Sequence, residues 1–276
     1  MNPNSTLIFL EKDHLYKSTN PEEKIDWISV TNFVNQFKPK FDPVTQALKS
    51  SKNPKSKWYG MDPVKIQEYW NLEGTRAASA GTAFHNQREV DLSGIDTIER
   101  SGLHIPVIKP IYQDGIKHAP DQRLVEGIYP EHMVYLKSAG LCGQSDRVEV
   151  IKGVVDIYDY KTNKEIKTKG FTNWEGRTEK MLHVCAHLDN CNFNHYALQL
   201  STYLYIILKH NPTFKPGKLC LHHIVFEKDS EDQFGYPIYK FDSNGDPVVE
   251  KLIVYDVPYL KEEVKNMIEY LKQTKI

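Results

Sequence analysis

The sequence predicts an α/β fold in which a mixed central β-sheet is flanked by helices and preceded by a basic N-terminal lobe. Two runs rich in Val and Ile, 144–151 and 154–161, flank Lys152-Gly153, and a two-residue loop with Gly is a strong hairpin signal. Residues 194–210 repeat apolar side chains at three- and four-residue spacings, which is typical of a helix packed on a sheet. The apolar run 219–226 suits a further strand of that sheet.

Length and composition set the expected organisation. A chain of 276 residues can form one α/β domain with an appendage, which we divide into an N-terminal lobe, residues 1–74, and a core, residues 75–276. The chain has no long apolar run and no signal-peptide pattern at its start, so we expect a cytoplasmic protein without a membrane partner. A net charge of −1 means that any DNA contact must come from local basic patches.

The first 37 residues predict a small sheet followed by a helix. We expect short strands at 6–10, 14–16 and 27–30, and a helix from Thr31 to Phe37 with Ser29 or Thr31 as its N-cap.

A basic segment follows between Lys38 and Gly60. It carries six lysines against the single acid Asp42, and it ends on two aromatic residues. Lysines that neutralise phosphates beside aromatic rings that stack on bases would form a single-strand binding platform. The same composition fits a solvated linker. The candidate DNA-binding residues of this segment are Lys52, Lys55, Lys57 and Trp58.

Two helices are expected next, at 63–70 and 75–90, separated at Gly74. The second contains His85, although a lone helical His is more often a core or surface residue than a ligand. Residues 93–127 read as irregular, and 130–138 as a strand that begins near Glu131.

The predicted hairpin carries the chemistry. If Lys152 and Gly153 form its loop, then Asp146 faces Asp159, and Lys161 lies on the same, otherwise apolar, face. Opposed carboxylates on a mostly buried face must share a proton, gain a cationic partner or bind a metal. Mg²⁺ prefers oxygen ligands and is commonly held by one or two carboxylates. A solvated surface hairpin is the simpler interpretation for a lone Asp-x-Lys, but the placement of all three charges on the apolar face favours a site.

The C-terminal third contains a predicted hairpin, a predicted helix and a segment that could bind zinc. We expect a hairpin of 236–241 and 247–256 around Asn244-Gly245, and a closing helix at 258–271. A segment rich in His and Cys precedes the 194–210 helix, and its spacing matches no common zinc pattern, so zinc binding there stays open. Its residues are His183, Cys185, His187, Cys191 and His195.

Four motifs in order resemble one family. Gly81-Thr82-Ala83-Phe84-His85 resembles a GTxxH motif; Gly143-x-x-Asp146 and Asp159-Tyr160-Lys161 resemble the core of the PD-(D/E)xK nucleases; and Gln199-Leu200-Ser201-Thr202-Tyr203 resembles a QLxxY motif. Together they are similar to the RecB-type branch, which includes phage exonucleases and the mitochondrial genome maintenance exonuclease. The Pro of the superfamily name is replaced by Ser145.

The resemblance implies a restriction-endonuclease-like core and assigns roles to residues. Catalysis would involve Asp146, Asp159, Lys161 and Gln199. One or two Mg²⁺ or Mn²⁺ ions would be held by His85, Asp146, Asp159 and the backbone carbonyl of Tyr160. DNA would contact Tyr203. Beyond the hairpin, Lys164 continues a basic rim that suits phosphate contacts and equally fits an exposed loop. An iron–sulfur cluster, which some members hold through a Cys before the GTxxH motif, is not expected, because the first Cys is Cys142.

The function implied is a metal-dependent deoxyribonuclease. An exonuclease on single-stranded DNA or DNA ends in phage-type replication or recombination is the expected subtype, with a helicase or a single-strand annealing protein as possible partner. An endonuclease of the same superfamily, such as a resolvase or restriction-like enzyme, is the nearest alternative. A catalytically silent DNA-binding or recombination-mediator module is the alternative from another class.

Overall fold

A six-stranded mixed sheet forms the centre of the protein. The computed structural model describes residues 6–100 and 102–274. The sheet has the order β14-β11-β10-β9-β3, and β8 pairs with β9 as well. Its strands are β3 (Ile28–Ser29), β8 (Gly127–Leu136), β9 (Leu141–Ile151), β10 (Val154–Lys161), β11 (Lys215–Phe226) and β14 (Val249–Asp256). Helices cover it on both faces, so the α/β class is confirmed.

The β9–β10 hairpin has the expected register. Val154 pairs with Ile151, and Tyr158 pairs with Arg147. Lys152 and Gly153 both have positive φ, 51° and 71°, as a two-residue hairpin turn requires. Beyond Tyr158 the strands diverge, and β10 continues its parallel pairing with β11.

The divergence opens an edge of β9. On that edge β3 pairs in parallel with Leu141 and Cys142 only. Between the described partners β3 and β10, residues 143–145 of β9 therefore have β8 alone as a ladder partner. Polar side chains can enter the sheet there without displacing backbone hydrogen bonds.

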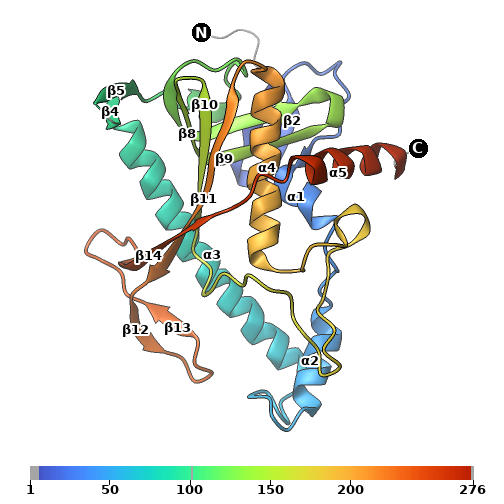
Figure 1. Cartoon of the computed structure of the whole chain (residues 1–276). Helices are drawn as coiled ribbons and strands as arrows, with labels where there is room; N and C mark the ends of the chain where they lie inside the picture. The colour runs from blue at the N-terminus through green and yellow to red at the C-terminus, as the bar shows by residue number, and fades with distance from the viewer. Residues whose placement is uncertain (1–5, 101, 275–276) are drawn as a thin grey trace.

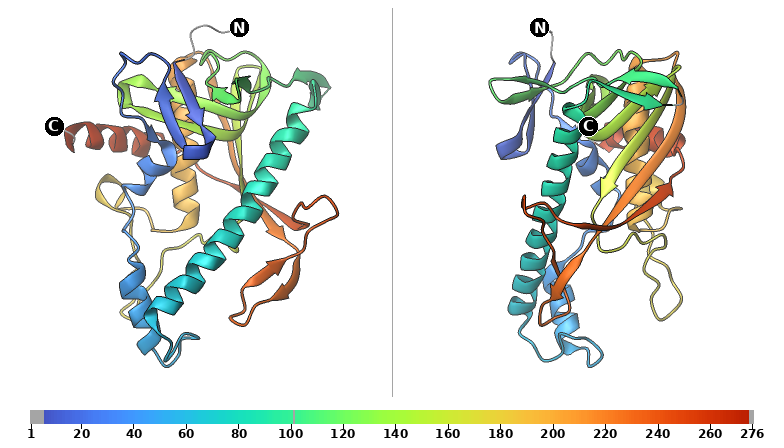
Figure 2. Two further views of the ribbon diagram at one scale, coloured as in Figure 1. Left: turned by 180° about the vertical axis from the view of Figure 1, so that it is seen from behind. Right: turned by 90° about the vertical axis from the view of Figure 1, so that its left-hand side faces the viewer.

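The helices form a layer on each face (Figure 1). Helix α4 (Asn192–His210) buries ten residues against one face, and α5 (Lys261–Thr274) packs on α4 through Val264, Met267 and Ile268. Helix α1 (Val30–Asn35) joins the same core, and Ser29 caps it by accepting the Asn32 N–H. The long helix α3 (Pro63–Ser93) crosses the other face (Figure 2).

A smaller sheet lies on the α3 side of the molecule (Figure 2). It has the order β2-β1-β7-β6, so the N-terminal strands pair with strands from the middle of the chain. Its strands are β1 (Leu7–Leu10), β2 (Leu15–Ser18), β6 (Ile111–Gln113) and β7 (Ile116–His118), and the 3-10 turn η1 (Glu11–Asp13) joins the first two.

Two expectations about the first half of the chain are corrected. The stretch 93–127, expected to be irregular, contains β4 (Thr97–Arg100), β5 (Leu103–Pro106), β6 and β7. Helix α3 is continuous through Gly74, so the division expected between residues 74 and 75 falls inside a helix. Neighbouring helical residues carry the helix across Gly74, because one glycine costs only about 1 kcal/mol. The basic segment holds a capped helix, α2 (Pro43–Lys52), with Asp42 as N-cap and Pro43 in the first turn.

The C-terminal hairpin is also corrected. β13 (Pro237–Tyr239) pairs with β12 (Lys228–Glu231), whereas β14 pairs with β11 over most of its length. Only an isolated bridge joins Phe241 to Pro247. The apolar β11 offers β14 a longer ladder than β13 does. The remaining short elements are η2 (Lys137–Ala139) and η3 (His183–Cys185). Among the described residues, no helix has the length and apolar content needed to cross a bilayer.

Candidate active site

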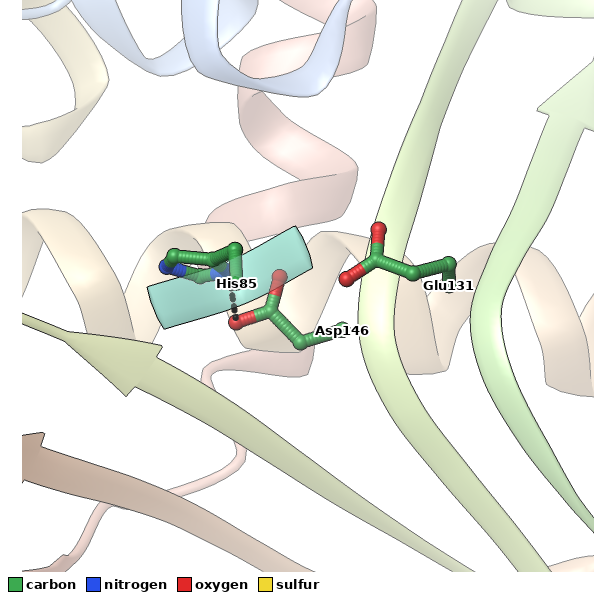
Figure 3. Close-up of side chains that lie close together, drawn as sticks. All are labelled: His85, Glu131 and Asp146. Atoms are coloured by element: carbon green, nitrogen blue, oxygen red, sulfur yellow. Dashed lines mark ion pairs between the residues drawn. The ribbon is translucent and has the colours of Figure 1, made fainter. Parts of the chain in front are cut away.

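Three side chains from three elements converge at the point where β9 and β10 diverge. They are His85 of α3, Glu131 of β8 and Asp146 of β9, and one potential ligand atom from each lies within 4.8 Å of the others (Figure 3). His85 Nδ1 is 3.5 Å from Asp146 Oδ2. An imidazole nitrogen and two carboxylates are a donor set that can hold a divalent metal ion.

A close approach of α3 to the end of β10 brings His85 into place. A Cβ at Gly81, one turn before His85, would lie 2.7 Å from Thr162 Oγ1, so only glycine allows this contact. Phe84 packs against Tyr160 and Phe226, with ring centroids 5.7 and 5.9 Å apart. The Gly-Thr-x-x-His pattern therefore has a packing reason as well as a ligand.

Glu131 is the residue to which sequence reasoning gave too little weight. It faces Asp146 across the β8–β9 ladder, since the flanking pairs are Pro130 with Arg147 and His132 with Ser145. Its φ of +47° is uncommon for a residue without a glycine's freedom, and such backbone strain clusters at functional sites. A turn ending at Gly140 would have given this register from the sequence.

The charge of Asp146 raises the pKa of two neighbouring carboxyl groups. Burial, and then the charge of Asp146, raises the pKa of Glu131 to about 8. Burial raises the pKa of Asp159 to about 6, because the attraction of Lys161 offsets only part of it and Asp146 adds to the rise. A bound cation would relieve both effects.

The expected ligand set divides into two neighbouring groups. Asp159, which is 2% exposed, forms an ion pair with Lys161 instead of joining the His85–Glu131–Asp146 group. The Lys161 Nζ lies 4.9 Å from the centre of the Tyr196 ring. Tyr160 contacts the site through its backbone N–H, which donates to Asp146 Oδ2 at 2.6 Å.

An open cavity of about 640 Å³ surrounds the three converging side chains. Gln199 lines it and donates to the Tyr203 hydroxyl at 3.2 Å and to Thr31 Oγ1 at 3.4 Å. Tyr203 is only 3% exposed, and its ring lies so close to Gly143 that a Cβ there would be 2.8 Å away. Gln199 and Tyr203 thus belong to the inner wall of the cavity.

The candidate DNA-binding lysines of the N-terminal lobe lie outside this cavity. Lys52 and Lys55 are exposed, as is Lys164 beyond β10. Lys57 donates to the Phe234 carbonyl at 2.7 Å, and its Nζ is 3.9 Å from the centre of the Tyr236 ring. Burial lowers the pKa of Lys57, and the charge of Lys164 lowers it further, so these two lysines lie near each other.

The prediction that Trp58 offers a free ring to a base is corrected. Trp58 is 5% exposed and packs in a small core with Ala47 and Ile66. Its ring also lies 4.7 Å from that of Phe234. Trp58 is the largest of the three buried residues of this small core.

The His- and Cys-rich segment has separate partners for its histidines. His183 Nδ1 is 2.9 Å from the Tyr270 hydroxyl, His187 pairs with Glu263, and His195 Nε2 is 2.7 Å from Asn190 Oδ1. Within residues 6–100 and 102–274, the His, Cys, Asp and Glu side chains that converge on one point are those of the His85 group.

No family model matches the chain, and no curated protein matches it.

Proposed function

We propose that this protein is a metal-dependent deoxyribonuclease that hydrolyses the phosphodiester bonds of DNA, with Mg²⁺ or Mn²⁺ as its ion. One observation carries the proposal: His85, Glu131 and Asp146 converge where β9 and β10 diverge, and the Asp159–Lys161 pair lies within the electrostatic reach of Asp146. A metal site that lies in a cavity next to a buried lysine suits hydrolysis of a phosphodiester.

Each residue has a task in this proposal. His85, Glu131 and Asp146 would hold the ion, which lowers the pKa of a bound water and stabilises negative charge on the phosphate. Lys161, oriented by Asp159, supplies a positive charge near the attacked phosphate. Gln199, held by its hydrogen bonds to Tyr203 and Thr31, lines the cavity and keeps its geometry. The Tyr160 N–H holds the Asp146 carboxylate in position.

Action on an unpaired strand or a DNA end is the part of the proposal that the cavity supports. A volume of about 640 Å³ is in the range of small-ligand sites and too small for a duplex. An exonuclease on single-stranded DNA or ends fits this size. An endonuclease that takes a single unpaired segment through the same cavity fits it as well.

A labelled linear single strand and its closed circle separate the two subtypes. Each is incubated with EDTA, Mg²⁺ or Mn²⁺ and either the parent protein or Asp146→Ala. Metal-dependent loss of the linear strand alone, absent with the variant, is expected. Cutting of the circle would assign an endonuclease, and equal cutting by the variant would remove the site from the reaction.

A further inference from the structure

The N-terminal hairpin of β1, η1 and β2 forms one wall of the candidate active-site cavity, although it belongs to the smaller sheet. Its Phe9, Glu11, His14 and Tyr16 line the cavity together with the metal-binding group. None of the four motifs discussed above includes any part of residues 7–18. The hairpin therefore contributes a surface that the catalytic proposal does not use.

The hairpin is held firmly in its place. Phe9 pairs with Lys117 of β7, and Ala119 donates its backbone N–H to the Leu7 carbonyl at 2.9 Å. His14 closes the turn in the left-handed region, with φ of 49° and its N–H on the Glu11 carbonyl at 3.1 Å. Apart from Gly, this conformation is adopted most often by Asn, Asp and His. It fixes where the His14 side chain leaves the backbone.

The wall is aromatic. Phe9 is 7% exposed and packs in a core with Leu7 and Met133. Against it lie the rings of Tyr16, with centroids 4.7 Å apart, and His14, at 5.2 Å and nearly perpendicular. Tyr16 is half-buried, and His14 is exposed. Phe9 thus anchors two rings that face the cavity, and His14 has the freer surface.

The charges that line the cavity indicate which part of a nucleotide the β1–β2 hairpin can bind. The carboxylates Glu89, Glu131 and Asp146 line the cavity with His85, and Glu11 adds a fourth carboxylate on the hairpin itself. A phosphate can approach this lining only where a cation neutralises it, at the His85 group. The hairpin has an acid and three rings but no cation lining the cavity, so it repels phosphate and offers π-faces.

We propose that the β1–β2 hairpin is the base-binding wall for the unpaired nucleotide next to the scissile phosphate, with His14 as the residue that stacks on the base. This inference rests on the proposed nuclease function and deepens it. It makes the hairpin the element that selects an unpaired strand over the interior of a duplex, because a base inside a duplex is stacked on both faces by its neighbours. Stacking on aromatic side chains tolerates every base, so no sequence preference is expected.

The test measures binding of a fluorescently labelled dT₅ by anisotropy in Ca²⁺, with gel analysis to show that the oligomer stays intact. The same oligomer with an abasic nucleotide at its 5′ or 3′ end is compared with it. The proteins are the parent, His14→Ala, His14→Phe and Leu15→Ala. Leu15 is the matched control, because it is exposed on the same hairpin and does not line the cavity.

The parent is expected to bind the intact oligomer about tenfold more tightly than the oligomer that is abasic at one of its ends. His14→Ala should lose that preference by weakening only the intact oligomer, whereas His14→Phe and Leu15→Ala should keep it. Retention of the preference by His14→Ala, or no preference in the parent, would overturn the inference.

The two proposals fail in different ways. If the parent shows the His14-dependent preference but cuts no DNA under any metal, the base-binding wall stands and the nuclease does not. If the parent cuts DNA in an Asp146-dependent manner and His14→Ala binds as the parent does, the nuclease stands and the wall does not. Thermal melts of each variant show whether the hairpin change has left the fold intact.

Discussion

Replacement of Glu131 by Gln should make the metal-free protein more stable and at the same time deprive it of its metal. The neutral amide keeps the size of the side chain and can still accept the hydrogen bond from Gln144. It removes one of the two carboxylates that face each other across β8 and β9, of which Asp146 remains. The variant therefore separates the cost of this carboxylate to the fold from its contribution to the site.

The sign of the pH dependence follows from the pKa of Glu131. Its ordinary value is 4.5, and in the folded protein burial and Asp146 raise it to about 8. Folding therefore favours the protonated form, and the stability gained by holding that proton is complete below about pH 4.5. It is lost as the pH rises through about 8, because the charge must then be carried in the folded state.

The size of the effect is up to about 5 kcal/mol, since each pKa unit corresponds to about 1.4 kcal/mol. Asp159, whose pKa is about 6, contributes in the same direction between about pH 4 and 6, but it does so in parent and variant alike and cancels from their difference. The difference in free energy of unfolding between Glu131→Gln and the parent should hence grow from pH 5 to pH 8.5. Lys117, which lowers the Glu131 pKa, limits this growth.

Urea denaturation from pH 5 to 8.5, with and without Mn²⁺, measures this difference. Mn²⁺ should restore the stability that the parent loses at high pH and leave Glu131→Gln unchanged. Glu250→Gln, at an exposed position on β14, is the control and should follow the parent. Parallel pH curves for parent and Glu131→Gln would show that Glu131 does not cause the loss of stability at high pH. Equal stabilisation of both proteins by Mn²⁺ would show that Glu131 does not bind the ion.

Three further changes test single contacts. Lys161→Ala should lower the free energy of unfolding by about 3–5 kcal/mol at pH 8, because it leaves the buried Asp159 carboxylate without its cation. Adding Asp159→Asn should recover most of this loss in urea denaturation, and no recovery would contradict the ion pair. Gly81→Ala should lower the free energy of unfolding by about 1–3 kcal/mol and weaken Mn²⁺ binding in calorimetry, because the new methyl group meets Thr162 Oγ1. Adding Thr162→Ala should restore binding, whereas full binding by Gly81→Ala alone would show that α3 does not need this close contact. Trp58→Ala should destabilise the protein by about 3–5 kcal/mol, and a melting curve like that of the parent would mean that the ring is not part of a core.

The sequence predicted those parts of the fold that depend on local pattern. The Lys152-Gly153 turn fixed the β9–β10 register, and Ser29 capped α1 as expected. The continuity of α3 was missed because Gly74 was taken as a breaker, although tertiary packing overrides one weak helix former. The pairing of β1 with β7 joins segments about 100 residues apart, and no local pattern reports such a contact.

The candidate site shows the same division. His85 and Asp146 come together as the motifs predicted, whereas Asp159 pairs with Lys161 and Glu131 takes the third position. The Lys152-Gly153 turn predicts the register on the β10 edge of β9 only, whereas Glu131 faces Asp146 across the β8 edge. Trp58 was misjudged because an aromatic residue among lysines has the same composition whether its ring is buried or free.

The most direct test of the central claim is the cleavage of a labelled linear single strand by the parent and by Asp146→Asn over a titration of Mn²⁺. Cleavage by the parent should be absent in EDTA, rise with added Mn²⁺ and saturate. The variant should lose at least about 100-fold in rate, because a metal ion contributes several kcal/mol to the stabilisation of the transition state. Cleavage that persists in EDTA, or that is equal in the two proteins, would contradict metal-dependent catalysis at Asp146.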